Sequence, residues 1–210
     1  MRFAILLLLL HFLCFQQHVY AQPAQVQFNR IDISQGLSNN QVKGVFKDSR
    51  GFLWLATMSG LNRYDGYQFK IFRHSPRDSM SLSDNYILRV FEGPEKKIWV
   101  ETHNGINIFD PVTETVDRNI AAYLKKLSLP AVTITAMVKD AEDNCWFLMA
   151  GQFLYKYIAA TGKTTLVYEL PAGAPPISSM AQDNLADTWL VHTNGTTEKI
   201  SHKTGKIVLP

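Results

Sequence analysis

The chain has 210 residues, of which 46% are hydrophobic and 19% charged, and its formal net charge is +3 at pH 7. This composition is typical of an ordinary globular protein with enough apolar residues for a core. The charge is mild and scattered, with no basic stripe, which argues against nucleic acid as a direct partner of this segment.

Residues 1–21 have the features of a secretory signal peptide. Arg2 is followed by a mostly apolar run from Phe3 to Phe15. A basic start, an apolar segment of about 7–15 residues and a small residue at the cut are typical of such peptides, whereas a membrane-spanning helix needs roughly 20 apolar residues. Val19 and Ala21 suit the positions three and one before cleavage. We therefore expect cleavage after Ala21 and export of the mature chain.

Residues 22–36 are expected to contain a lone strand. Val26 to Ile33 alternates apolar and polar residues, which is the pattern of a half-buried strand. In β-propellers an N-terminal strand often completes the last blade and closes the ring. The alternation therefore predicts a closing strand in this segment.

A repeat follows, and it includes every tryptophan of the chain. The tryptophans are spaced 45, 47 and 43 residues apart: Trp54, Trp99, Trp146 and Trp189. Turn-forming residues lie six positions before them: Asp48, Gly93, Asp140 and Asp183. Glycines lie six positions after three of them: Gly60, Gly105 and Gly195. A self-similar period in the forties indicates a repeat architecture.

Each period reads as four short strands. In the first copy the β-rich or apolar runs are Val42 to Lys47, Leu53 to Thr57, Leu61 to Tyr64 and Phe69 to Phe72. Asp48 and Gly51 suit the first turn, because Asp can bond its own backbone and Gly can adopt positive φ. Four strands in about 45 residues are typical of a propeller blade, whereas a β-sandwich gives no reason for one Trp per period. The predicted fold is an all-β propeller with four four-stranded blades, at about residues 37–80, 81–126, 127–172 and 173–210.

The repeat residues are interpreted as structural. Asp and Gly would shape the first turn of a blade, and Trp would pack between blades. The residues in this class are Asp48, Gly51, Trp54, Gly60, Trp99, Gly105, Asp140, Trp146, Asp183, Trp189 and Gly195.

Two further local patterns carry predictions. Ile120, Leu124 and Leu127 are spaced for one face of a short helix, which would expose Lys125 and Lys126. Cys145 is the only cysteine after residue 21, so it can form neither an internal disulfide nor the usual zinc site. We expect it to pack in a strand.

No metal site or cofactor is predicted, because the histidines lack metal-ligand spacing.

The runs Gly36 to Val42, Asp48 to Thr57 and Gly60 to Phe69 together resemble the two-component regulator propeller repeat. This repeat builds the periplasmic sensor region of hybrid two-component systems, especially those that govern polysaccharide use in gut Bacteroidetes. The second copy, Ser83 to Asp110, matches well but has Gly93 in place of Asp. The third and fourth copies are degenerate.

The resemblance implies more than these four blades. Members of the family typically carry two seven-bladed propellers, a β-sandwich, a membrane helix, a histidine kinase, a receiver and a DNA-binding module. It implies that the chain is a fragment of a periplasmic sensor, with its blades forming part of a seven-bladed ring. The intact receptor would be a homodimer, attached to the membrane through its downstream region. It would detect oligosaccharides and control polysaccharide-utilisation genes, while this chain itself would not be an enzyme.

One face of the propeller is the expected ligand site. The linkers that precede the first strands and the turns between the second and third strands should emerge on the same side. They supply Asn39, Asn40, Met58, Asp84, Asn85, His103, Asn104 and His192. Polar amides near aromatic residues suit carbohydrate hydroxyls, which need both donors and acceptors.

Two alternatives remain open from the sequence. The propeller could be a lyase or glycosidase that acts on extracellular polysaccharide, or a dimerisation scaffold that binds no ligand. The predicted inner strands, Val42 to Lys47 and Ile87 to Glu92, are mostly apolar with single charges. That pattern favours a sensor over an enzyme, but it does not separate a sensor from a scaffold.

Overall fold

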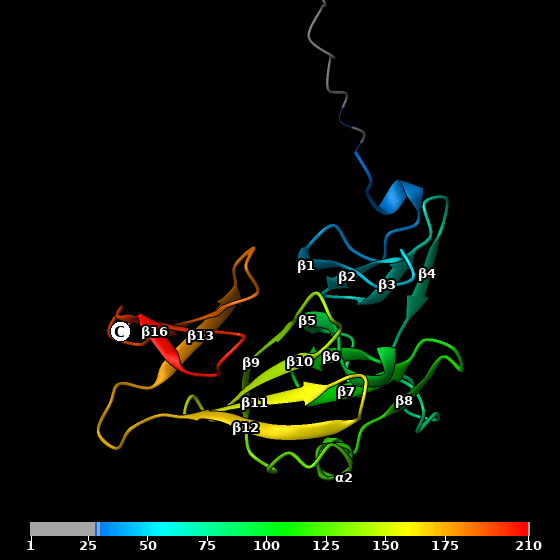
Figure 1. Cartoon of the computed structure of the whole chain (residues 1–210). Helices are drawn as coiled ribbons and strands as arrows, with labels where there is room; N and C mark the ends of the chain where they lie inside the picture. Colours follow the sequence, from blue (N-terminus) through cyan, green and yellow to red (C-terminus); the bar gives the residue numbers. More distant parts are fainter. Residues whose placement is uncertain (1–27, 29, 210) are drawn as a thin grey trace, which may run out of the picture. The chain divides into compact units, whose positions relative to one another are not determined.

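The computed structural model describes residue 28 and residues 30–209 (Figure 1). The predicted signal peptide and residues 22–27 and 29 of the predicted closing segment lie outside the described residues. No helix in the described part of the chain is long and apolar enough to cross a membrane.

Four antiparallel sheets, each with four strands in sequence order, make up the fold; we call them blades 1 to 4. Blade 1 contains β1 (Val42–Lys47), β2 (Leu53–Thr57), β3 (Gly60–Tyr64) and β4 (Phe69–Phe72). Blade 2 contains β5 (Ile87–Glu92), β6 (Ile98–Thr102), β7 (Gly105–Asp110) and β8 (Thr115–Asp117). Blade 3 contains β9 (Ile134–Lys139), β10 (Cys145–Met149), β11 (Phe153–Ile158) and β12 (Lys163–Glu169). Blade 4 contains β13 (Ile177–Gln182), β14 (Thr188–His192), β15 (Thr197–Ile200) and β16 (Ile207–Leu209). The predicted fold class is confirmed.

The four tryptophans occupy the same place in each blade. Each is the second residue of the second strand, in β2, β6, β10 and β14. The register is also shared: Trp54 lies opposite Phe46 of β1, as Trp99 lies opposite Phe91 of β5. The even spacing of these residues therefore reflects four copies of one structural unit.

Three of the tryptophans pack between neighbouring blades. Trp54 is fully buried against Ile98 and Phe109 of blade 2. Trp99 is fully buried, and its ring centroid lies 5.6 Å from that of Phe147 in blade 3. Trp146 shares a cluster with residues of blade 4. Aromatic side chains bury large apolar areas, so these contacts hold successive blades together.

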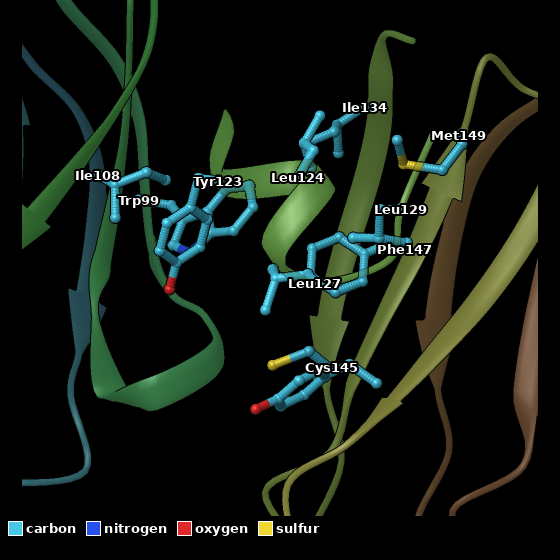
Figure 2. Close-up of a cluster of buried hydrophobic side chains, with 11 residues drawn as sticks. Trp99, Ile108, Tyr123, Leu124, Leu127, Leu129, Ile134, Cys145, Phe147 and Met149 are labelled. Carbon is cyan, nitrogen blue, oxygen red and sulfur yellow. The ribbon is translucent and has the colours of Figure 1, made fainter. Parts of the chain in front are cut away.

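A short helix completes the core between blades 2 and 3 (Figure 2). The helix α2 (Ile120–Lys126) begins where the Asn119 side chain accepts the Ala122 N–H. It buries Tyr123 and Leu124 and exposes both of its lysines, as predicted. The Tyr123 ring meets Trp99 edge-on at 5.6 Å between centroids.

Cys145 lies in the same cluster and is fully buried. Burial raises the pKa of its thiol to about 12. The thiol is therefore protonated at neutral pH and packs as an apolar group, as expected from the sequence.

The expected closing strand is not what the described residues form. Residues 28, 30, 31 and 32 have no strand pairing, and Ile33–Gln35 is a 3-10 helix. The Asp32 carboxylate accepts the Ser34 N–H at 2.8 Å, and the Gln35 side chain accepts the Asp32 N–H at 2.7 Å. This reciprocal capping satisfies the backbone locally, so the apolar alternation over Val26 to Ile33 does not determine the structure at its end.

Gly60 provides a test of the blade geometry. Its φ is +123°, and a Cβ placed there would lie 2.7 Å from the Phe72 carbonyl oxygen. Gly60→Ala should therefore lower the free energy of unfolding by about 2 kcal/mol, from both positive φ and steric overlap. Urea denaturation measures this change.

Gly105 is the matched control for Gly60. It has the equivalent position in blade 2 and a φ of +103°, but a Cβ there meets nothing within 4 Å. Gly105→Ala should cost only about 1 kcal/mol, from the backbone alone. Equal losses in the two variants would contradict the steric explanation.

Candidate functional site

In every blade, hydrogen bonds join the linker before the first strand to the turn after the second strand. In blade 1, Asn39 Nδ2 donates to Ser59 Oγ at 3.1 Å, and in blade 2, Asn104 Nδ2 donates to the Ser83 carbonyl oxygen at 3.3 Å. In blades 3 and 4 the bonds join backbone groups: Ala150 N–H donates to the Thr133 carbonyl oxygen at 2.7 Å, and Thr193 N–H donates to the Pro176 carbonyl oxygen at 2.8 Å. Each blade therefore places these two kinds of loop together at one end, as predicted. We call this end of the blades the linker face.

A buried polar triad fixes the linker face of blade 1. Ser38 Oγ lies 2.8 Å from Thr57 Oγ1, and Asn62 Oδ1 accepts the Ser38 N–H at 2.9 Å. The Asn62 amide also donates to Ser38 Oγ at 2.8 Å. Thr57 and Asn62 are fully buried, so this network replaces the water that their polar groups lose.

The same triad recurs 45 residues later in blade 2. Ser83 Oγ lies 3.0 Å from Thr102 Oγ1, and Asn107 Oδ1 accepts the Ser83 N–H at 2.7 Å. Neither triad was predicted from the sequence, although its three members recur in blade 2 at the same offset of 45 residues. Blades 1 and 2 therefore present their linkers in the same way.

Most of the predicted ligand residues in blades 1 and 2 have structural contacts. Asn39 Oδ1 accepts the Gln41 N–H at 2.7 Å, and Asp84 Oδ1 accepts the Tyr86 N–H at 3.0 Å. Asn85 Oδ1 accepts the His74 N–H at 2.8 Å. Asn40 Oδ1 likewise accepts the Ile33 N–H at 3.1 Å, and the exposed Asn104 donates to the Ser83 carbonyl oxygen, whereas Met58 is half-buried. These amides and carboxylates shape the linkers that carry the face.

His103 is the predicted residue that is best placed for a ligand. Its exposed ring stacks on Tyr86 with 4.5 Å between centroids and 26° between planes. Lys43 Nζ of β1 lies 5.9 Å from the centre of the Tyr86 ring. Blades 1 and 2 thus contribute an aromatic pair and a cation to one accessible area.

His192 has a different environment from the other predicted residues. It is only 4% exposed, with Nδ1 2.7 Å from the Pro175 oxygen and Nε2 3.6 Å from Glu198 Oε2. Tyr168 of blade 3 donates to the same Glu198 oxygen at 2.7 Å. His192 therefore links blade 4 to its linker, and the structure gives no contact between it and His103.

A groove opens between blades 2 and 3, beside His103. Its volume is about 550 Å³. Leu88 and Ile106 of blade 2 line it, together with Ile120 of α2 and Val132 and Ile134 of blade 3 and its linker. This groove was not predicted from the sequence, because its walls come from segments that only the packing of the blades brings together.

The opposite end of three blades contains a second repeated arrangement, which joins an acid, the tryptophan and a cation. The acid accepts the indole N–H in Asp48–Trp54 at 2.8 Å, Asp140–Trp146 at 3.0 Å and Asp183–Trp189 at 3.0 Å. A cation from the third strand lies over each indole ring: Arg63 at 5.8 Å, Lys156 at 4.6 Å and Lys199 at 5.4 Å from the centroid. Both interactions fix the indole ring, so each aspartate contributes to the position of its tryptophan.

Blade 2 lacks both partners of its tryptophan. Gly93 replaces the acid, and Ile108 lies opposite Trp99 where the other blades have a cation. Trp99 Nε1 is buried without a hydrogen-bond partner. The indole ring fills the space instead, since a Cβ on Gly93 would lie 2.1 Å from Trp99 Nε1.

A buried ion pair at this end connects three blades. Glu92, 2% exposed, accepts from Ser49 Oγ at 2.8 Å and pairs with Lys139 Nζ at 2.5 Å. Burial alone would lower the pKa of Lys139, but hydrogen bonds to Glu92 and Asp143 outweigh it and raise that pKa. Because Ser49, Glu92 and Lys139 come from blades 1, 2 and 3, these contacts link the three blades.

Comparison with known proteins identifies the repeat. Residues 36–59 match the family described as two component regulator propeller. A stretch of 61 residues is 41% identical to histidine kinase P4 of Formosa agariphila; it covers 29% of this chain and 4% of that protein. The chain therefore corresponds to a small part of this relative.

Two solved structures share the fold. Both are of the extracellular domain of BT4673 from B. thetaiotaomicron, named a one component system in one case and a hybrid two component system in the other. Their TM-scores are both 0.53, with identities of 20% and 19% over 87% and 88% of this chain. The matched regions are 28% and 27% of those chains, and at these identities the likeness concerns the fold alone. With the family match in blade 1, the resemblance seen in the sequence is confirmed: this chain contains the two component regulator propeller repeat.

Proposed function

We propose that this chain is part of the extracytoplasmic sensor region of a two-component signalling protein, and that it is not itself an enzyme. The family match at residues 36–59 is the observation that carries the proposal. The histidine kinase relative and the extracellular domains with the same fold support it. The charged groups at the end opposite the linker face support a non-catalytic role, because Glu92 is paired with Lys139 across blades 2 and 3 and Asp140 is paired with Lys156 within blade 3.

The ligand that we propose is an oligosaccharide bound on the linker face. The exposed His103 ring, stacked on Tyr86, offers an aromatic surface, and Lys43 offers a donor beside it. Sites for small polar ligands combine such surfaces with a few placed polar groups. Binding there would favour one arrangement of the receptor, and the membrane segment of the intact protein would pass that bias to the kinase.

Tyr86→Ala and His103→Ala in the intact receptor test this proposal. Calorimetry with an oligosaccharide panel should show at least about a tenfold loss of affinity, because stacked rings near the centre of a site dominate binding. Tyr67→Ala is the matched control, since Tyr67 is 94% exposed on the β3–β4 turn and has no place on the linker face. Full affinity and full transcriptional response in both test variants would show that this face is not the site.

A further inference from the structure

Blade 2 has a charged pair at a position where its neighbours make apolar contacts. Arg89 of β5 lies opposite Glu101 of β6, and their side chains form an ion pair. The residue two positions after the tryptophan, which is Glu101 in blade 2, is Ala56 in blade 1 and Leu148 in blade 3. Ala56 and Leu148 are fully buried in the clusters that join their blades to the next ones. The contact between blades 2 and 3 lacks this apolar part.

A groove takes the place of the missing contact. It has a volume of about 550 Å³, and Glu101 and His103 of blade 2 line it together with Thr133 of the linker and several aliphatic residues. An exposed ion pair contributes little to stability, whereas burial of an apolar side chain contributes more. Departures from a repeat that lower stability are expected at functional sites. The Arg89–Glu101 pair is therefore better explained by binding than by packing.

Both members of the pair keep hydrogen-bonding groups for a ligand. Nε of Arg89 and Oε2 of Glu101 are the atoms that join the two side chains. Within the described part of the chain, the terminal guanidinium nitrogens of Arg89 and Oε1 of Glu101 make no other hydrogen bond. The two side chains are 54% and 25% exposed. The pair thus offers donors and an acceptor side by side, without a net charge.

From these observations we infer that Arg89 and Glu101 bind neighbouring hydroxyl groups of an uncharged sugar unit in the groove, next to a unit stacked on His103. This inference rests on the proposed oligosaccharide function. A hydroxyl group can both donate and accept a hydrogen bond, so one hydroxyl would donate to Glu101 while its neighbour accepts from Arg89.

A charged sugar unit fits this pair less well. A carboxylate would be attracted by Arg89 but repelled by Glu101, and an ammonium group would meet the opposite combination. Neither charge would recover the water that it loses in the groove. The exposed Thr133 hydroxyl on the far side of the groove is neutral as well. Lys43 lies at the Tyr86 ring, so its charge bears on the neighbouring unit.

Calorimetry on the intact receptor tests the charge preference of the wild type. The probes are oligosaccharides that end in glucose, glucuronic acid or glucosamine, with a galactose and a mannose series prepared in the same way. The tightest ligand should be a neutral member, and it should bind at least about tenfold more tightly than its acidic and amino counterparts. A receptor whose tightest ligand is an acidic or an amino member would overturn the inference.

Removing one member of the pair should shift this preference in opposite directions. Glu101→Gln leaves the Arg89 charge unpaired, so the affinity for the acidic sugar relative to the neutral one should rise at least about tenfold. Arg89→Gln leaves the Glu101 carboxylate unpaired, so the corresponding ratio for the amino sugar should rise to a similar extent. A merely structural role would lower the affinity for all three sugars alike, and that result would contradict the inference.

Lys70→Gln is the matched control. Lys70 pairs with Glu114, and the exposed fractions of these side chains, 53% and 29%, are close to those of Arg89 and Glu101. This pair joins β4 to the β7–β8 turn and takes no part in the linker face. The substitution should therefore leave every affinity and every ratio unchanged.

The outcomes separate the inference from the proposed function. If neutral sugars bind and neither Arg89→Gln nor Glu101→Gln changes their affinities, the inference is wrong while oligosaccharide sensing stands. Binding of other glycans but of no member of the three series would also overturn it. If no glycan binds at all, the proposed ligand class itself is wrong.

Discussion

Asp140→Asn is expected to lower the free energy of unfolding by about 4 kcal/mol. The Asp140 side chain is only 2% exposed. Its Oδ2 atom accepts from Trp146 at 3.0 Å and from the Asn144 amide at 3.0 Å, and it lies 3.2 Å from Lys156 Nζ. Asparagine would turn an NH₂ group toward these donors or toward the backbone N–H groups on the other side, and it would leave Lys156 unpaired. Breaking a buried pair in this way costs about 3–5 kcal/mol.

Asp183→Asn is the matched control for Asp140→Asn. Asp183 makes the same indole contact to Trp189 at 3.0 Å, but its side chain is 23% exposed. Lys199 would also keep its second partner, Asp187, at 2.9 Å. Urea denaturation should therefore show a clearly smaller loss for Asp183→Asn. Losses of the same size would mean that burial of the carboxylate does not determine the cost.

The effect of Asp140 should disappear in acid. Burial alone would raise the pKa of Asp140, but hydrogen bonds from Trp146 and Asn144 outweigh it and hold that pKa below its ordinary value. A carboxyl group whose pKa is lower in the folded state stabilises the fold above its unfolded pKa of about 3.9. This stabilisation is lost as the pH falls through the folded pKa. The unfolding free energies of wild type and Asp140→Asn should therefore converge below about pH 4; a constant difference down to pH 2 would contradict this account.

The spacing of the tryptophans was enough to predict the blades, because each Trp belongs to a unit that is determined locally. Residues that are near in sequence determine each element of this unit: the turn around Asp48, the apolar strand that follows it and the tight turn at Gly60. The helix over Ile120–Lys126 was predictable for the same reason. Local pattern and packing agree at these positions, which is when sequence reasoning is dependable.

At Ile33, the last residue of the N-terminal alternation, the described backbone begins a 3-10 helix and not a strand. Alternation over Val26 to Ile33 predicts a strand, but a strand needs a neighbouring edge. At Ile33 the reciprocal caps of Asp32 and Gln35 give the backbone its partners without one. The Asx-x-x-Gln spacing was present in the sequence and was the better predictor there.

The candidate site was only partly predictable. The linker face follows from topology, so His103 could be nominated from its position alone. Its stacking on Tyr86 and the groove beside it depend on how blades 2 and 3 and α2 pack, which no local pattern encodes. The cations over the tryptophans were a missed signal, since Lys156 and Lys199 each follow their Trp by ten residues.

Gly93→Asp, which would restore the acid that the other blades have, is expected to destabilise the protein by about 3 kcal/mol. A Cβ at Gly93 would lie 2.1 Å from Trp99 Nε1 and 2.5 Å from Trp99 Cδ1. The indole cannot move aside easily, because it is fully buried between Phe91 and Phe147, with ring centroids at 5.9 and 5.6 Å. Overpacking a fixed core of this kind costs about 1–3 kcal/mol. The new carboxylate would add the cost of burying a charge, because Ile108 lies opposite Trp99 where the other blades have a cation that could pair with it.

A double-mutant cycle tests this explanation of Gly93. Trp99→Leu removes the overlapping ring, so Gly93→Asp should cost much less in the Trp99→Leu background than in the wild type. Gly44→Asp is the control for the residue type, since a Cβ at Gly44 meets nothing within 4 Å, and it should be nearly neutral. Urea denaturation measures all four proteins, and the indole N–H resonance of Trp99 reports its environment. If Gly93→Asp were as stable as the wild type and this resonance shifted to that of a hydrogen-bonded indole, blade 2 would accept the common repeat. The position of Trp99 would then not explain why residue 93 is a glycine.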